Sequence, residues 1–137
     1  MEALAPGVDF SREIGLTLER GLGQVSGVME HNRLVAFALW HTAPLAEGRP
    51  ADELRVLKLA ARDLGAFRLL LEALEAAARG AHAHRIAIRC QTAYRAAYGE
   101  LLEAGYRVHW TDLRMTLDGR REPAAPGDGI LFSNWEI

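Results

Sequence analysis

The chain has 137 residues, half of them hydrophobic, with a formal net charge of −2 and a sequence pI near 6.2. This length and apolar content support one domain, residues 1–137, with one sizeable core. The slightly acidic balance argues against nucleic acid as a partner, because such binding depends on neutralising phosphates. No apolar run approaches the roughly 20 residues that cross a bilayer, and residues 1–8 do not resemble a signal peptide. We therefore expect a cytoplasmic protein with no membrane partner.

The single cysteine, Cys90, cannot form an internal disulfide, which fits a reducing compartment. It falls in phase with Ile86 and Ile88 on one strand face, so its expected role is to fill the core. Almost all the basic residues are arginine, with Lys58 the only lysine. This usage is typical of a GC-rich bacterial genome and indicates nothing about mechanism.

In chain order, the spacing of Ile14, Leu18 and Leu22 predicts a helix over residues 10–22, with Asp9 or Ser11 as its N-cap. Residues 24–30 and 34–42 read as two strands around a tight His31-Asn32 turn, where asparagine tolerates positive φ. Residues 34–40 are all apolar, so the side chains on both faces of this strand are apolar. This predicts a strand inside the sheet that is covered on both faces. The stretch 43–52 is predicted to be a loop.

The pattern then predicts a strand over 54–60, a helix from Asp63 to about Arg79 that Gly80 ends, and a strand over 85–90. The two strands should pair in parallel, because the helix between them is the crossover that parallel pairing requires. A second helix, capped by Thr92, closes at Gly105. Residues 106–117 predict a long strand with a bulge near 111–112, followed by a loop over 119–129 and a final strand over 130–137.

This order of elements resembles the GNAT acetyltransferases over nearly the whole chain, with the first strand missing. The segments that carry the resemblance are residues 23–25 (GQV), 33–38 (RLVAFA) and 97–106 (AYGELLEAGY). The chain looks most like the C-terminal half of bacterial proteins with two GNAT domains, which often begin like residues 6–9 (PGVD) and end with a Trp strand like Asn134-Trp135. The resemblance implies an α+β, three-layer fold with a mixed, mostly antiparallel sheet, a splayed parallel central pair and flanking helices.

The resemblance also implies that the protein uses acetyl-CoA. In GNAT enzymes the pantetheine arm lies like an extra strand in the gap between the two splayed strands. The backbone of Leu57, Lys58 and Leu59 would be its partner. The pyrophosphate would lie at the start of the following helix, on a loop of the pattern Arg/Gln-x-x-Gly-x-Gly/Ala. That loop here reads Arg62, Asp63, Leu64, Gly65, Ala66 and Phe67.

Two residues depart from the loop pattern. Phe67 replaces the small residue that lets the backbone come close to phosphate, and Asp63 places a negative charge beside it. Repulsion of about 1 kcal/mol at a solvated loop costs about tenfold in affinity and does not abolish binding. The alternative is an ordinary strand-to-helix turn in which Asp63 serves only as the N-cap.

GNAT enzymes commonly protonate the leaving thiolate with a tyrosine, but Leu101 stands at the matching position and Tyr98 lies one helical turn away. The alternative for Tyr98 is a half-buried structural aromatic. A base for the amine would come from Glu53, His41 or Asp52, with His109 and Asp112 behind them, although each also reads as a surface residue. His82 and His84 lack a third ligand, so we expect no metal.

Two functions remain open at this point. The first is transfer of an acetyl group from acetyl-CoA to a small amine or a peptide. The second is a catalytically silent GNAT-like module that binds a partner or forms a dimer. Because residues 24–30 would form an open sheet edge, we also predict a homodimer that pairs sheet edges or final strands.

Overall fold

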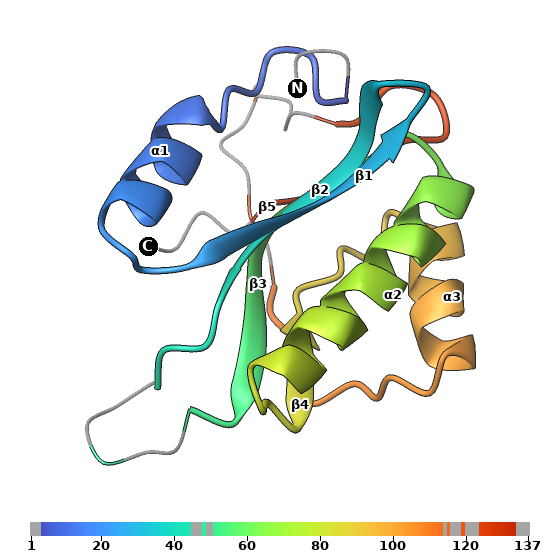
Figure 1. Ribbon diagram of the computed structural model, residues 1–137. Helices are drawn as coiled ribbons and strands as arrows, with labels where there is room; N and C mark the ends of the chain where they lie inside the picture. The colour runs from blue at the N-terminus through green and yellow to red at the C-terminus, as the bar shows by residue number, and fades with distance from the viewer. Residues whose placement is uncertain are drawn as a thin grey trace.

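The computed structural model describes residues 4–44, 48, 51–113, 115, 119 and 124–133. Its elements are α1 (Ser11–Glu19), β1 (Gln24–Glu30), β2 (Arg33–His41), β3 (Glu53–Ala61), α2 (Leu64–Gly80), β4 (Arg85–Ile88), α3 (Arg95–Glu103) and β5 (Ile130–Ser133). The strands form one mixed sheet, with α1 on one side and α2 and α3 on the other (Figure 1). The predicted α+β, three-layer architecture is confirmed.

The hairpin of β1 and β2 forms as the sequence predicts. The turn residues His31 and Asn32 have φ values of 48° and 61°, the left-handed conformation that a tight two-residue hairpin turn needs. Residues 35–40 of β2 are at most 5% exposed, so this strand is covered on both faces. The prediction of an internal strand, made from the continuous run of apolar residues, is therefore confirmed.

The unit of β3, α2 and β4 also matches its prediction. Asp63 caps α2, and the apolar stripe of the helix, with Phe67, Leu70 and Leu74 fully buried, packs on the sheet. β3 and β4 are parallel, with Glu53 opposite Arg85 and Val56 opposite Ile88. The long helix thus serves as the crossover between them.

Several predicted boundaries were wrong. Residues 106–113 form no regular strand, and the predicted strand beyond them lies largely outside the described residues. The N-cap positions belong to Phe10 and Tyr94, neither of which makes a side-chain cap bond; Asp9 instead accepts a hydrogen bond from the Ser11 amide. Alternating apolar residues predict a strand only where a neighbouring strand is available to pair with them. Asn134 and Trp135, which carried part of the resemblance, lie outside the described residues.

Tyr106, directly after α3, has a buried hydroxyl with no hydrogen-bond partner among the described residues. Burial, and to a lesser extent the nearby Glu75, raises the pKa of this phenol to about 12. We expect Tyr106→Phe to leave the free energy of unfolding unchanged or raise it by about 1 kcal/mol, because it removes an unsatisfied polar atom. Urea denaturation measures this change. Tyr98→Phe on α3 is the matched control with no expected effect, and a clear loss of stability in the Tyr106 variant would contradict the assignment.

Candidate functional site

The site begins where β3 parts from its parallel neighbour. One edge of β3 pairs with β2 from Arg55 to Ala61. The other edge is shared: β4 pairs with it from Glu53 to Val56, and β5 pairs with it from Lys58 to Ala61. Leu57 stands between these two ladders, at the point where β4 has ended. The predicted separation of the parallel pair is therefore present, with its vertex at Leu57.

A β-bulge lies at the same residue. Along β2, the register moves from Trp40 opposite Val56 to Leu39 opposite Lys58, which leaves Leu57 without a register partner. Such bulges bend a strand and redirect its groups, and they are common beside active sites. Nothing in the sequence indicates a bulge at this position, because Leu57 looks like any other strand residue.

Beyond Leu57, the edge of β3 from Lys58 to Ala61 borders a gap, which we call the slot. The last described strand of the chain, β5, fills this slot. Lys58 and Leu59, two of the three residues expected to offer free backbone, pair with Ser133 and Phe132 of β5. Phe132 is 3% exposed, and its ring meets those of Phe67 and Tyr94 edge-on, with centroids 5.9 and 5.7 Å away. The expectation that the backbone of Lys58 and Leu59 is unpaired was therefore wrong. The slot is present, but main chain and an aromatic side chain occupy it.

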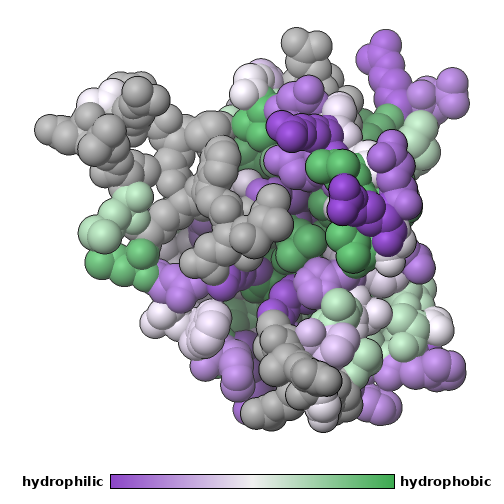
Figure 2. Space-filling model, turned by 90° about the vertical axis from the view of Figure 1, so that its left-hand side faces the viewer, coloured by the Kyte–Doolittle hydropathy of each residue, from purple (hydrophilic) through white to green (hydrophobic). Residues whose placement is uncertain are grey.

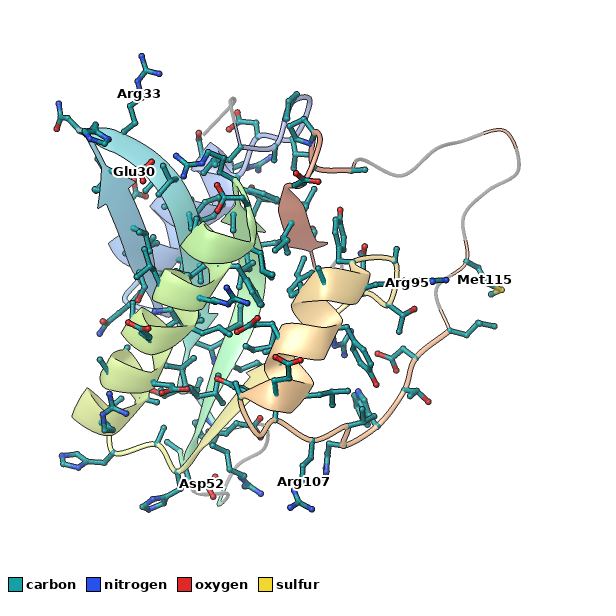
Figure 3. The ribbon with its side chains drawn as sticks, turned by 90° about the vertical axis from the view of Figure 1, so that its right-hand side faces the viewer. Glu30, Arg33, Asp52, Arg95, Arg107 and Met115 are labelled. Carbon is teal, nitrogen blue, oxygen red and sulfur yellow. The ribbon has the colours of Figure 1, made fainter. Side chains whose placement is uncertain are left out.

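A hollow of about 450 Å³ adjoins this slot. Three segments form it: residues 63–65 at the start of α2, residues 94–97 at the start of α3, and residues 127–130 at the entry to β5. The amino ends of two helices therefore meet here, and helix amino ends favour anions. The Arg95 side chain points outward from α3, away from α2 (Figure 3), so the hollow depends on backbone groups more than on this cation.

The loop expected to bind pyrophosphate is held by its own side chains. The Asp63 carboxylate accepts a hydrogen bond of 2.8 Å from the Ala66 amide and one of 2.7 Å from Arg62 Nε. The Ala66 bond is the main cause that lowers the pKa of Asp63, and Arg62 adds to it. Arg62 also pairs with Glu30, and the two carboxylates raise its pKa. The Ala66 amide and the Arg62 charge expected for the coenzyme are thus both engaged within the chain.

The other members of this loop differ in their surroundings. Leu64 and Gly65 line the hollow, whereas Phe67 is fully buried and packs against Phe132. We expected the bulky Phe67 ring to keep the backbone away from phosphate. The helix directs the ring into the core, and the ring does not line the hollow.

The structure brings a different tyrosine to the site from the one predicted. Tyr98 is half-buried on α3, and no described contact joins it to β5 or the hollow. Tyr94, one turn earlier, lines the hollow, meets Phe132, and its hydroxyl lies 3.4 Å from the Ala125 amide. Counting from Gly105 could not identify Tyr94, because the contact depends on where β5 docks.

The candidate bases lie at the opposite end of β3 from the hollow. Figure 3 shows Asp52 at one end of the sheet and Glu30 at the other. Asp52 pairs with Arg85 at 2.9 Å, and Glu53 pairs with Arg55.

His41 lies at the same end of the sheet, beside Arg55 in the register of β2 and β3. Its Nδ1 accepts a hydrogen bond of 3.1 Å from the Ala43 amide. Burial, followed by the charge of Arg55, lowers the pKa of His41. A neutral imidazole with its lone pair on Nδ1 already engaged is a poor proton acceptor, so Glu53 is the better candidate of the two.

Metal-binding clusters and membrane-spanning helices are both absent from the described residues. These residues contain no group of three His, Cys, Asp or Glu side chains placed to hold a metal ion. Burial raises the pKa of Cys90 to about 11, so its thiol stays protonated at neutral pH. No helix in the described part of the chain is long and apolar enough to cross a bilayer.

The architecture recurs in proteins of known structure. No protein-family model and no curated protein sequence matches the chain. Crystal structures of TTHA1254 from Thermus thermophilus, wild type and a point mutant, are each 21% identical, with TM-scores of 0.66 and 0.67, over 88% of this chain and 90% of theirs. The aminoglycoside N-acetyltransferase AAC(6')-Iy in complex with CoA is 11% identical, with a TM-score of 0.56, over 77% of this chain and 89% of that one. These likenesses establish that the chain has a GNAT-like fold.

Proposed function

We propose that this chain is an N-acetyltransferase that transfers the acetyl group of acetyl-CoA to a primary amine. One observation carries the proposal: β3 is bulged and leaves its parallel partner at Leu57, and the edge beyond accepts an extended backbone. A pantetheine arm is an extended chain with amide groups, so it can pair with such an edge as a strand does. AAC(6')-Iy, a structure of similar fold, contains CoA.

In this proposal the backbone of Lys58 and Leu59 binds the pantetheine arm, and the adjoining hollow takes the diphosphate. The hollow combines two helix amino ends with Gly65, whose lack of a side chain leaves room for an anion. Asp63 has to turn away from the α2 amides, or remain as a repulsive neighbour, when the diphosphate enters. Arg62, released from Asp63, then becomes available to the anion.

The chemistry is a direct attack within a ternary complex. The amine nitrogen attacks the thioester carbonyl carbon, so that a C–N bond forms and the C–S bond breaks. The sulfur leaves with the bonding electron pair and takes up a proton, and the amine nitrogen loses one. Main-chain groups around the Leu57 bulge would polarise the carbonyl.

Proton transfer in this scheme falls to residues on opposite sides of the vertex. The Tyr94 hydroxyl is our preferred proton donor to sulfur in place of Tyr98, because Tyr94 borders the slot. Glu53 is our preferred base for the amine and lies four residues before Leu57, roughly 13 Å along the strand. At that distance Glu53 would act through water or on the incoming end of the amine.

Isothermal titration with acetyl-CoA, followed by an acetylation assay on a panel of amines and peptides, tests the function. We expect micromolar binding of acetyl-CoA and release of free CoA thiol that depends on the amine. Tyr94→Phe should lower kcat more than it changes KM, while Tyr98→Phe serves as the matched control. Absence of acetyl-CoA binding to the full chain, both as wild type and as the Phe132→Ala variant, would reject the proposal.

A second candidate function is a catalytically silent GNAT-like module. The structure gives this alternative a specific basis, because β5 fills the slot and Asp63 caps the helix that would bind the anion. Such a module would use the GNAT scaffold to bind a partner chain. Failure to bind acetyl-CoA, together with a stable complex with a protein partner, would favour it.

We also propose that the chain is a single-domain, cytoplasmic protein related to the C-terminal half of tandem GNAT proteins. We further propose that it forms a homodimer. Among the described residues β1 lies at the edge of the sheet, and the exposed Leu18 and Leu22 near it are 52% and 62% accessible. Figure 2 shows the face on the α1 side, where hydrophobic patches lie between hydrophilic ones. Sedimentation equilibrium at high micromolar concentration should give a dimer mass, which Leu18→Glu should reduce; a monomer at all concentrations would contradict the dimer.

A further inference from the structure

The edge of β3 beyond Leu57 can hold only one strand at a time. β2 covers the opposite edge as far as Ala61, so the segment from Lys58 to Ala61 has a single free side. In the structure β5 takes that side, with Ser133 opposite Lys58 and Ile130 opposite Ala61. A pantetheine arm on the same backbone groups would have to take the same place. The two arrangements exclude each other.

β5 is held mainly by apolar side chains. Its residues Ile130, Leu131 and Phe132 are each at most 4% exposed and reach the cores on both faces of the sheet. A polar contact at the end of the strand joins Lys58 Nζ to Ser133 Oγ at 3.2 Å. The ladder itself spans only four residue pairs, so the docking of β5 depends on these anchors.

The entry to β5 also forms part of the neighbouring hollow. Residues 127–130 line it opposite the starts of α2 and α3. Gly127 has a φ of +55°, and a side chain at Gly129 would come within 3 Å of Ala125 and Pro126, so this turn is closely fitted. Withdrawal of β5 from β3 would therefore open the slot and remove one wall of the hollow in the same movement.

We propose that β5 is a displaceable latch, which competes with the pantetheine arm of acyl-CoA for the Lys58–Ala61 edge of β3. This inference rests on the proposed function, because it needs a coenzyme that pairs with β3. While β5 is paired with β3, the slot is closed to water and to CoA. The observed affinity for CoA is therefore the intrinsic affinity multiplied by the fraction of molecules in which β5 has left β3, the open fraction.

Hydrogen exchange on the full wild-type chain, with and without CoA, tests the latch directly. On adding CoA we expect the amides of Ile130–Ser133 to lose protection, because β5 leaves the sheet. The amides of β3 from Lys58 to Ala61 should keep their protection, because the coenzyme replaces the lost strand. Unchanged or increased protection of β5 while CoA binds would overturn the latch and leave the acetyltransferase proposal intact.

A pair of variants separates the latch from general loss of stability. Phe132→Ala removes the main anchor of β5 and should tighten CoA binding by about tenfold or more, because it raises the open fraction. Leu74→Ala on α2 removes a comparably buried side chain away from β5 and should destabilise the fold without tightening binding. Equal or weaker binding by the Phe132 variant, relative to wild type, would overturn the latch. Failure of wild type and of Phe132→Ala alike to bind CoA would reject the proposed function as well as the latch.

Discussion

Phe67→Ala is expected to lower the free energy of unfolding by about 3–5 kcal/mol, a large share of the stability of a domain this size. The ring is fully buried and packs edge-on against Phe132 at 5.9 Å, so its removal leaves a cavity between α2 and the sheet. Urea or guanidinium denaturation followed by circular dichroism measures the loss. In conditions where it remains folded, the variant should bind CoA at least as tightly as wild type, because the ring does not line the hollow and its loss weakens the packing of Phe132 that holds β5 on β3.

Phe67→Leu is the matched control for this experiment. It retains an apolar side chain in the core, so its loss of stability should be clearly smaller than that of the alanine variant. A loss of stability below about 1 kcal/mol in the alanine variant would contradict the placement of Phe67 in the core.

Asp63→Asn is expected to strengthen CoA binding by about five- to tenfold, because one negative charge beside the diphosphate is worth about 1 to 1.4 kcal/mol. Asparagine caps helices about as well as aspartate, and its side-chain oxygen can still accept a hydrogen bond from the Ala66 amide. Titration calorimetry at low ionic strength measures the change. Glu72→Gln on the exposed side of α2 makes the same change in net charge about 13 Å further along the helix and should have little effect. Equal gains in both variants would indicate a general charge effect instead.

The same pair of proteins, wild type and Asp63→Asn, should differ in how stability depends on pH. The pKa of Asp63 is lowered in the folded protein, mainly by the Ala66 hydrogen bond. A lowered folded pKa stabilises the fold above the unfolded value, near 3.9, and this contribution is lost as the pH falls through the folded value. The stability of wild type relative to Asp63→Asn should therefore be constant near neutral pH and decline below about pH 4. Denaturation curves at a series of pH values measure this difference, and a constant difference down to about pH 2 would contradict it.

Two kinds of feature meet at the candidate site, and they differ in how far the sequence predicts them. The Asp63 cap and the parallel crossover over α2 were both predictable, because an N-cap residue and a helical apolar stripe act within a few turns of chain. The point at which β3 and β4 separate could be anticipated only from the resemblance to GNAT proteins. The contents of the gap could not be predicted, since they depend on a segment far along the chain, Ile130–Ser133.

Local sequence patterns are enough to specify three parts of the framework: the tight turn at His31-Asn32, a β2 strand buried on both faces, and the α2 helix with its cap. These features follow from backbone preferences and from the period of apolar residues, which act between near neighbours. Three other features became apparent only from the folded chain: the bulge at Leu57, the contact of Tyr94 with the slot, and the docking of β5 on β3. Pairing between distant strands depends on which sheet edge is free and which side chains fit against it, and local sequence patterns predict neither.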